Sequence, residues 1–180
     1  MVPRLSRRGA LAAAALTVSG CGAAEHPRSR GPRPGSGVAT LNSVLALEHA
    51  GVAAYGAAAA LLRGPQRASV DTVREQEREH VRRLAELIDG LGGRAVGPHP
   101  AAQYARSFPR LSDARDALLL AEDLEERLVR AHLDALTKLP AGPLRRVAAS
   151  IAASEAEHLA VVRGLRGVAR APDAFVTGTS

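Results

Sequence analysis

One short pattern, Glu-x-x-His, occurs in each half of the 180-residue chain and limits what it can fold into. Another Glu precedes each copy at nearly the same distance, 29 residues in the first half and 30 in the second. These six residues are Glu48, Glu77, His80, Glu125, Glu155 and His158. Because residues three apart on a helix project from the same side, each copy directs a carboxylate and an imidazole toward one point. The pattern predicts that the six side chains meet inside one helical bundle.

Four segments carry apolar residues at helical spacing, and the length of the chain fits one domain. The first runs from Thr40 or Asn42 to Arg63, and the others cover about 69–91, 112–139 and 143–166. Ser112 can cap the third helix, and Pro143 suits the first position of the fourth, where its missing N–H costs nothing. We therefore expect an all-α fold in which residues 38–170 form a four-helix bundle.

The segment between the second and third helices, residues 92–111, contains Gly-Gly, Gly-Pro, His-Pro and Phe-Pro pairs that argue against a helix there. A loop of this length is unusual inside a compact domain. A crossover that runs the length of the bundle explains it.

The six residues all fall on the apolar stripes of their helices. Four ionised carboxylates cannot stay unpaired there, because an isolated buried charge carries a large desolvation cost. Two divalent cations offset four negative charges, and iron or manganese takes a mixed oxygen and nitrogen ligand set well. Protonation and pairing with arginine are the alternatives, but the inward stripes carry almost no Lys or Arg. The sequence therefore favours metal.

The first 20 residues are typical of an export signal, with Arg4, Arg7 and Arg8 ahead of a short apolar run. Ser6 to Leu11 resembles a twin-arginine signal, and Val18-Ser19-Gly20-Cys21 resembles a bacterial lipobox, which implies lipidation of Cys21. The alternative is a plain secretory signal with an incidental cysteine. Residues 21–37, rich in Pro, Gly, Ser and Arg, read as a disordered tether, and 171–180 as a flexible tail. We expect an exported protein held at the outer face of the cytoplasmic membrane by a lipid on Cys21.

The basic residues give little support for nucleic-acid binding. Without the three arginines of residues 1–20, 21 basic residues stand against 18 acidic ones, a charge of +3. The basic residues that remain are scattered along helix surfaces with no aromatic residues between them.

The chain resembles the ferritin-like di-iron carboxylate bundle in two respects. Its helices are joined by a short loop, a long crossover and a short loop. Helices one and three each carry a lone Glu, and helices two and four each carry Glu-x-x-His. The resemblance covers about 40–166 and is strongest to small exported ferritin-like proteins of high-GC bacteria. It implies that Glu48 and Glu125 are terminal ligands, that Glu77 and Glu155 bridge two metal ions, and that each His binds one. It also implies two iron or manganese ions as the cofactor.

Three further residues are candidates to touch the ligands. Tyr55 and His132 each stand seven residues after a lone Glu, although core packing is the interpretation that we favour for them. Glu122 stands near the edge of the third apolar stripe. Glu122 and Glu126 are the alternatives to Glu125 as the inward carboxylate of the third helix. We expect His26, His49 and His99 at surface positions.

Two functions remain open at this level. The first is an exported, lipid-anchored ferritin-like protein with a dinuclear site for Fe(II) oxidation or for oxygen or peroxide chemistry. The second is a metal-free bundle that serves as a binding or structural lipoprotein of the cell envelope. A homodimer is compatible with both.

Overall fold

Five helices make up the part of the chain that the computed structural model describes, residues 36–172, 177 and 178. They are α1 (Ser36–Leu61), α2 (Gly64–Gly90), α3 (Ala101–Ser107), α4 (Ala114–Lys138) and α5 (Pro143–Leu165). The expected export signal, Cys21 and the tether as far as residue 35 lie outside the described residues.

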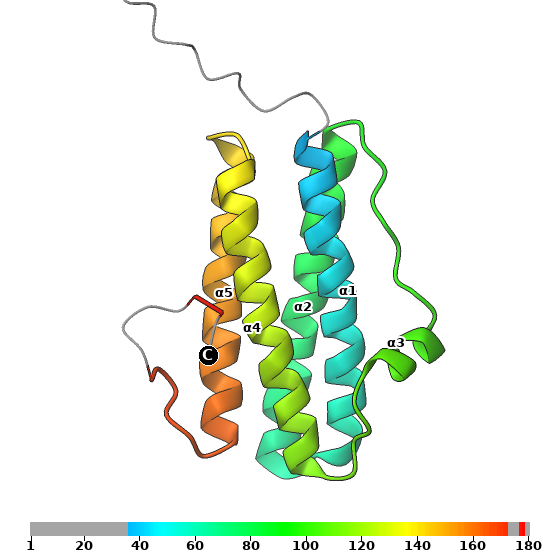
Figure 1. The fold of residues 1–180 in the computed structure, drawn as a ribbon, viewed down its shortest axis with the longest axis vertical. Helices are drawn as coiled ribbons and strands as arrows, with labels where there is room; N and C mark the ends of the chain where they lie inside the picture. The colour runs from blue at the N-terminus through cyan, green and yellow to red at the C-terminus, as the bar shows by residue number, and fades with distance from the viewer. Residues whose placement is uncertain (1–35, 173–176, 179–180) are drawn as a thin grey trace, which may run out of the picture. The chain divides into compact units, whose positions relative to one another are not determined.

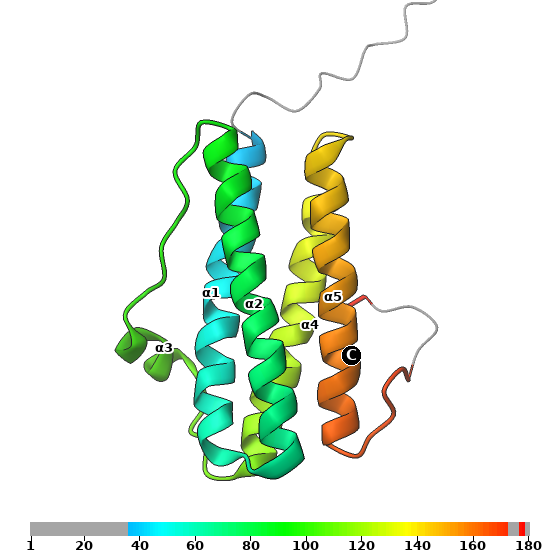
Figure 2. The ribbon, with the colours of Figure 1, turned by 180° about the vertical axis from the view of Figure 1, so that it is seen from behind.

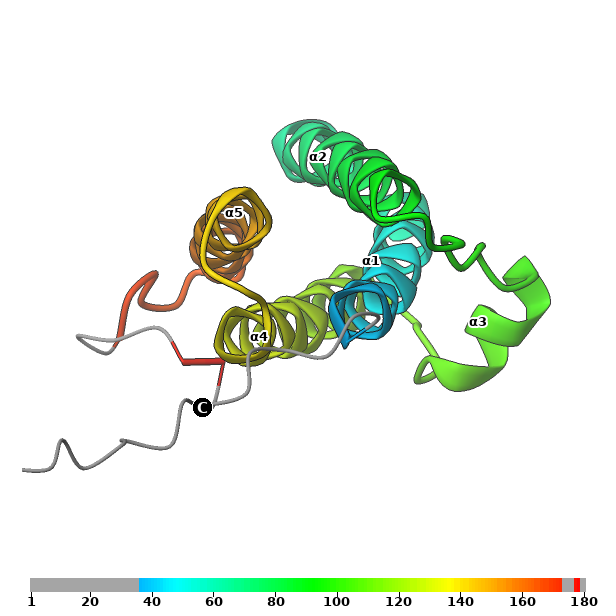
Figure 3. The ribbon, with the colours of Figure 1, turned by 90° about the horizontal axis from the view of Figure 1, so that it is seen from above.

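The four long helices form the expected bundle. Helices α1 and α2 are antiparallel neighbours, as are α4 and α5, and the crossover between α2 and α4 makes those two helices run in the same direction (Figures 1 and 2). Seen end on, they follow one another in the order α2, α1, α4, α5 (Figure 3). The pairs α1–α2, α4–α5 and α1–α4 pack closely, whereas α2 and α5 make far fewer contacts. One side of the bundle is therefore packed more loosely than the other three.

The helix ends differ from the expected ones by a few residues. Helix α1 begins at Ser36, so it includes the last two residues of the expected tether, and α2 begins at Gly64 with Pro65 in its first turn. Pro is tolerated there because the first N–H groups of a helix have no partner within it. The cap of α4 is Asp113 rather than Ser112, because the Asp113 side chain accepts a hydrogen bond from the Asp116 N–H at 2.9 Å.

The crossover contains a short helix, α3, which we did not expect from its prolines and glycines. Pro100 precedes the first turn of α3, a position where proline does not interrupt a helix. Tyr104 is the buried residue of α3, and its hydroxyl accepts a hydrogen bond from the His99 N–H. Asn42 of α1 binds the crossover through Arg94 O and Val96 N, at 2.9 and 2.8 Å.

Three apolar clusters are found in the described part of the bundle, and the two largest lie one toward each end. One contains Tyr55, Leu62, Val70, Leu118 and Val162, and the other contains Leu41, Leu45, Leu84, Ile88 and Leu139. Between them lies a layer of buried carboxylates and imidazoles. The apolar ends therefore hold this polar layer in place and shield it from water at both ends of the bundle.

Helix α1 is unusually apolar, and its residues 37–61 are long and apolar enough to cross a membrane, with a mean hydropathy of 1.4. Glu48 is its only charged residue apart from His49, which has an ionisable ring. The packing accounts for this composition, because α2, α3 and α4 all contact α1. A helix covered on several sides is apolar around most of its circumference.

The expected tail is described only at residues 171, 172, 177 and 178. Gly178 is buried, and its carbonyl accepts a hydrogen bond from Arg130 of α4.

Candidate metal centre

The six residues of the repeated pattern lie together in the middle of the bundle. Glu48, Glu77, Glu125 and Glu155 have no exposed surface, and His80 and His158 are 8% and 3% exposed. Each long helix contributes to the group, one Glu from α1 and from α4, and one Glu and one His from α2 and from α5. The apolar stripes of the sequence thus turn all six side chains inward.

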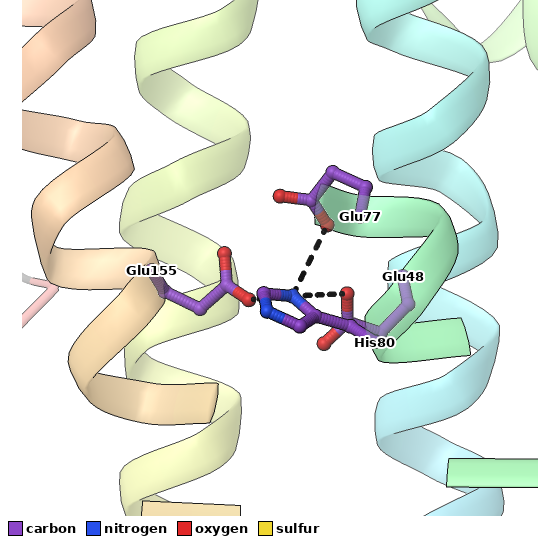
Figure 4. A group of neighbouring side chains, drawn as sticks. All are labelled: Glu48, Glu77, His80 and Glu155. Atoms are coloured by element: carbon purple, nitrogen blue, oxygen red, sulfur yellow. Dashed lines mark ion pairs between the residues drawn. The ribbon is translucent and has the colours of Figure 1, made fainter. Parts of the chain in front are cut away.

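These side chains form two overlapping groups, each with ligand atoms within 4.8 Å of one another. The first group is Glu48, Glu77, His80 and Glu155 (Figure 4), and the second is Glu77, Glu125, Glu155 and His158. Glu77 and Glu155 belong to both, whereas the lone glutamates and the histidines belong to one each. Two metal ions held by these groups would share two carboxylates.

The imidazoles face the carboxylates through their Nδ1 atoms. His80 Nδ1 lies 2.7 Å from Glu155 Oε1 and 3.6 Å from Glu48 Oε2. His158 Nδ1 lies 3.0 Å from Glu77 Oε1. The two rings are stacked with centroids 5.6 Å apart. Each Glu-x-x-His therefore interacts with the glutamate of the other copy.

Each of the four carboxylates keeps a buried oxygen that has no hydrogen-bond partner of good geometry within the described part of the chain. These atoms are Oε2 of Glu48, Glu77 and Glu125 and Oε1 of Glu155, the last of which faces His80 Nδ1 at 2.7 Å. A buried acceptor without a partner costs about 1–3 kcal/mol. Atoms of this kind, turned toward one another at the centre of a bundle, are suited to bind cations.

Burial is the main influence on the acids, since removal from water disfavours the ionised form. It raises the pKa of Glu48, and it raises the pKa of Glu77 and Glu125 well above the usual range. Burial also opposes ionisation of Glu155, but hydrogen bonds from His158 and His80 outweigh it and hold the pKa of Glu155 below its usual value.

The histidines that face the carboxylates take up the compensating protons. Burial works against their charged forms, but the contacts with Glu155 and Glu48 raise the pKa of His80 to about 10. The contacts with Glu155 and Glu77 likewise raise the pKa of His158 to about 9. Protons therefore balance much of the buried negative charge when no metal ion does so.

Tyr55 and His132 touch the lone glutamates across the α1–α4 interface. The Tyr55 hydroxyl donates to Glu125 Oε1, and His132 Nε2 lies 2.5 Å from Glu48 Oε1. Burial lowers the pKa of His132 to about 4, so its ring is neutral at neutral pH. Both side chains thus do more than fill the core.

Glu122 lies elsewhere, in an ion-pair cluster with two arginines of α5. Arg163 Nε lies 3.0 Å from Glu122 Oε1, and Arg166 pairs with the other oxygen of Glu122. Arg163 also binds Glu126 at 2.9 Å. The two glutamates that the sequence offered as alternatives to Glu125 therefore form ion pairs with arginines. Of these arginines, Arg163 is almost fully buried.

The other histidines also differ in their surroundings. His49 is only partly exposed, and its Nε2 lies 3.1 Å from the Val96 carbonyl of the crossover. His99 is exposed as expected, with its ring near that of Tyr104. His26 lies outside the described residues.

The sequence reasoning missed two features of the centre. A Cβ atom on Gly51 would lie 3.1 Å from Glu77 Oε2, so this glycine makes room for the shared carboxylate. Gln76 Oε1 and Ser154 Oγ lie 3.0 and 3.3 Å from His158 Nε2. A glycine inside a helical pattern indicates close approach of another group. The spacing of four residues between Ser154 and His158 on one helix could have indicated that contact, whereas nothing in the sequence marks Gln76.

The di-iron carboxylate proteins have this architecture, a four-helix bundle with a long crossover. In them, two helices carry a lone inward Glu and the other two carry an inward Glu-x-x-His. The donor set suits such a centre, because carboxylate oxygens and imidazole nitrogens are ligands of iron and manganese. The buried oxygens without partners fit the same class.

The chain belongs to the ferritin-like domain family, which matches residues 36–168. Among solved structures, it is similar to a conserved hypothetical protein, rv2844, from Mycobacterium tuberculosis, with a TM-score of 0.67 and 22% identity over 72% of this chain and 96% of that one. It is also similar to ferritin-like, diiron-carboxylate proteins from Bacillus anthracis str. Ames, with a TM-score of 0.62 and 22% identity over 73% and 96%. No curated protein matches the chain.

Proposed function

We propose that this protein is an exported, lipid-anchored ferritin-like protein that binds two iron or manganese ions for Fe(II) oxidation or for oxygen or peroxide chemistry. The observation that carries the proposal is the pair of overlapping ligand groups that share Glu77 and Glu155. In this arrangement Glu48 and His80 complete one metal site, and Glu125 and His158 complete the other. The ligand roles agree with those that the family resemblance implies.

Charge supports two divalent ions in particular. Four ionised carboxylates carry a charge of −4, which two divalent cations neutralise. Metal binding would displace the protons held by His80 and His158, because a ligating nitrogen must be unprotonated. Binding also gives partners to the buried oxygens of Glu48, Glu77 and Glu125.

The protein's own residues prepare the centre for this role. Tyr55 and His132 fix the orientation of Glu125 and Glu48 by hydrogen bonds, and partners of this kind raise the affinity of a ligand set for metal. The apolar cores toward the two ends of the bundle exclude water from those directions. The metal ions, when bound, would supply the electrons for reduction of oxygen or peroxide.

Export and anchoring rest on the sequence of the first 21 residues. A twin-arginine route carries folded proteins and therefore suits a centre that is loaded before export. Replacement of Arg7 and Arg8 by lysine should leave the protein in the cytoplasm. Cys21→Ala should release the exported protein from the membrane fraction, and retention of this variant in the membrane would exclude a lipid on Cys21.

Metal analysis tests the dinuclear site. After reconstitution with Fe(II) under anaerobic conditions, or with Mn(II), the purified protein should retain two equivalents. Glu77→Ala should abolish uptake, because Glu77 belongs to both ligand groups. Glu75→Ala is the matched control, since Glu75 lies on the same helix but is exposed. Less than one equivalent in the unaltered protein would exclude the proposal.

The metal-free bundle remains the second candidate, and one observation favours it. The ion pairs of His80 with Glu155 and of His158 with Glu77 neutralise part of the buried charge without any metal. A protein that takes up no metal and keeps its fold would then be a binding or structural lipoprotein of the cell envelope.

A further inference from the structure

A hollow of about 440 Å³ opens between α2 and α5, on the loosely packed side of the bundle. Its polar lining consists of Glu79, His80 and Arg83 from α2 and Arg146, Ser150 and Ser154 from α5. Figure 3 shows that these two helices are neighbours at this side. Because His80 belongs both to this lining and to the candidate metal centre, the hollow reaches the centre from outside.

The two histidines of the centre are unequal in their outer nitrogens. His158 Nε2 interacts with Gln76 and Ser154, at 3.0 and 3.3 Å. His80 Nε2 has no hydrogen-bond partner among the described residues, although its Nδ1 faces the carboxylates as that of His158 does. A metal-binding imidazole almost always donates its second N–H to an acceptor. The hollow is where an acceptor for His80 can lie.

The charge of the hollow favours an anion as this acceptor. Glu79 is paired with Arg82, and Arg83 lies 3.1 Å from Glu86. Arg146 is exposed, and its side chain has no ion pair or hydrogen bond in the part of the chain that the structure describes. Its charge is therefore the uncompensated one in the lining. Ser150 stands four residues further along α5, on the same side of the helix, and offers a hydroxyl donor.

We propose that the hollow between α2 and α5 binds a small free oxyanion, which accepts hydrogen bonds from His80 Nε2, Arg146 and Ser150. The bound anion gives His80 the partner that Gln76 gives His158, and so supports the metal ion on the His80 side. The support for the metal ion rests on the proposed function, whereas anion binding by itself does not. The bound anion makes the two halves of a nearly symmetric centre chemically different.

Sulfate is a suitable probe, because it is a small oxyanion whose iron and manganese salts are soluble. Calorimetric titration of the metal-free, full-length protein with sulfate, against chloride at equal ionic strength, should detect one site. Arg146→Ala should weaken sulfate binding by about tenfold or more, as expected for loss of a hydrogen bond from a charged group. Arg146→Lys should restore part of the affinity. Arg115→Ala is the matched control, since Arg115 is likewise exposed.

Equal sulfate affinity in the unaltered protein and in Arg146→Ala, or no binding at all, would overturn the anion site. Displacement of sulfate by phosphatidylglycerol vesicles would assign the hollow to a lipid headgroup and would overturn the free oxyanion. Neither result depends on metal, so both can be told apart from a failure of the proposed function.

The link to the centre is measured by Mn(II) titration with and without sulfate. If the anion supports His80, sulfate should tighten Mn(II) binding in the unaltered protein and in Arg115→Ala, and Arg146→Ala should lose this effect, because coupling between two ligands is reciprocal. Sulfate that binds at Arg146 without any change in Mn(II) affinity would overturn the link to His80. Absence of Mn(II) binding under all conditions would refute the proposed function and leave the sulfate result standing.

Discussion

The Tyr55 hydroxyl of α1 donates a hydrogen bond to Glu125 of α4 across the centre of the bundle. The reverse relationship also exists, because His132 of α4 lies 2.5 Å from Glu48 of α1. Each lone glutamate is thus held by the residue that stands seven positions after the other one. This reciprocity ties the two halves of the chain together at the α1–α4 interface, where the half-bundles pack most extensively against each other.

Tyr55→Phe tests whether this contact matters for metal. The variant leaves the buried Glu125 Oε1 without its donor, so the free energy of unfolding should fall by about 1–3 kcal/mol. Metal affinity should fall by roughly 10- to 100-fold, as for other residues that orient a ligand. Urea denaturation and Mn(II) titration measure the two effects. Tyr104→Phe is the control, because it removes the hydroxyl of a buried tyrosine of α3 and should leave metal affinity unchanged.

Gly51→Ala should separate stability from metal binding. The added Cβ would lie 3.1 Å from Glu77 Oε2, so the shared carboxylate must move. Alanine is favoured over glycine inside a helix by up to about 1 kcal/mol, so the metal-free protein should not lose stability. Metal affinity should nevertheless fall by about tenfold or more.

The control for Gly51→Ala is Gly56→Ala in the same helix. The atoms nearest to a Cβ at residue 56 would be those of the Arg74 guanidinium, with Nη2 at 3.0 Å, and this flexible side chain can move away. Both variants therefore gain helix propensity, and only the first displaces a carboxylate. Equal metal affinity in the two variants would show that Gly51 does not position Glu77.

The fold could be predicted from the sequence because two independent patterns agree. Apolar periodicity placed the four long helices, and the repeated Glu-x-x-His fell on the same stripes. The short helix α3 was missed, because its seven residues are stabilised by the burial of Tyr104, which local sequence does not reveal.

The neighbours of the centre were less predictable than its six residues. Arg163 is buried because Glu122 and Glu126 of another helix approach it, and such a pairing depends on how α4 and α5 pack. Gln76 of α2 meets His158 of α5 for the same reason. Periodicity shows which face of a helix is inward but not which residues of two helices stand opposite each other.

The stability of the metal-free protein should decrease as the pH rises from about 7 to about 10. The pKa values of His80 and His158 in the folded state, about 10 and about 9, exceed the ordinary value of 6.5. In this interval the folded state binds more protons than the unfolded state, so deprotonation favours unfolding. Thermal denaturation across this range measures the effect. The metal-loaded protein is the control, because its histidines carry no such protons, and a flat or rising profile for the metal-free protein would contradict the prediction.

Glu122→Gln and Glu125→Gln, one helical turn apart on α4, should have opposite consequences. Glu122 binds Arg163 and Arg166 rather than the centre, so Glu122→Gln should lower the free energy of unfolding, by about 1–3 kcal/mol, and should leave the amount of bound metal unchanged. Glu125 contributes to the group with His158, so Glu125→Gln should reduce metal uptake. Glu125→Gln should not destabilise the metal-free protein in the same way, because a neutral amide resembles the protonated acid that burial favours at this position.

Urea denaturation and metal analysis of both variants measure these effects on stability and on metal uptake. Loss of metal from Glu122→Gln would mean that the ion-pair cluster and the centre are coupled through α4.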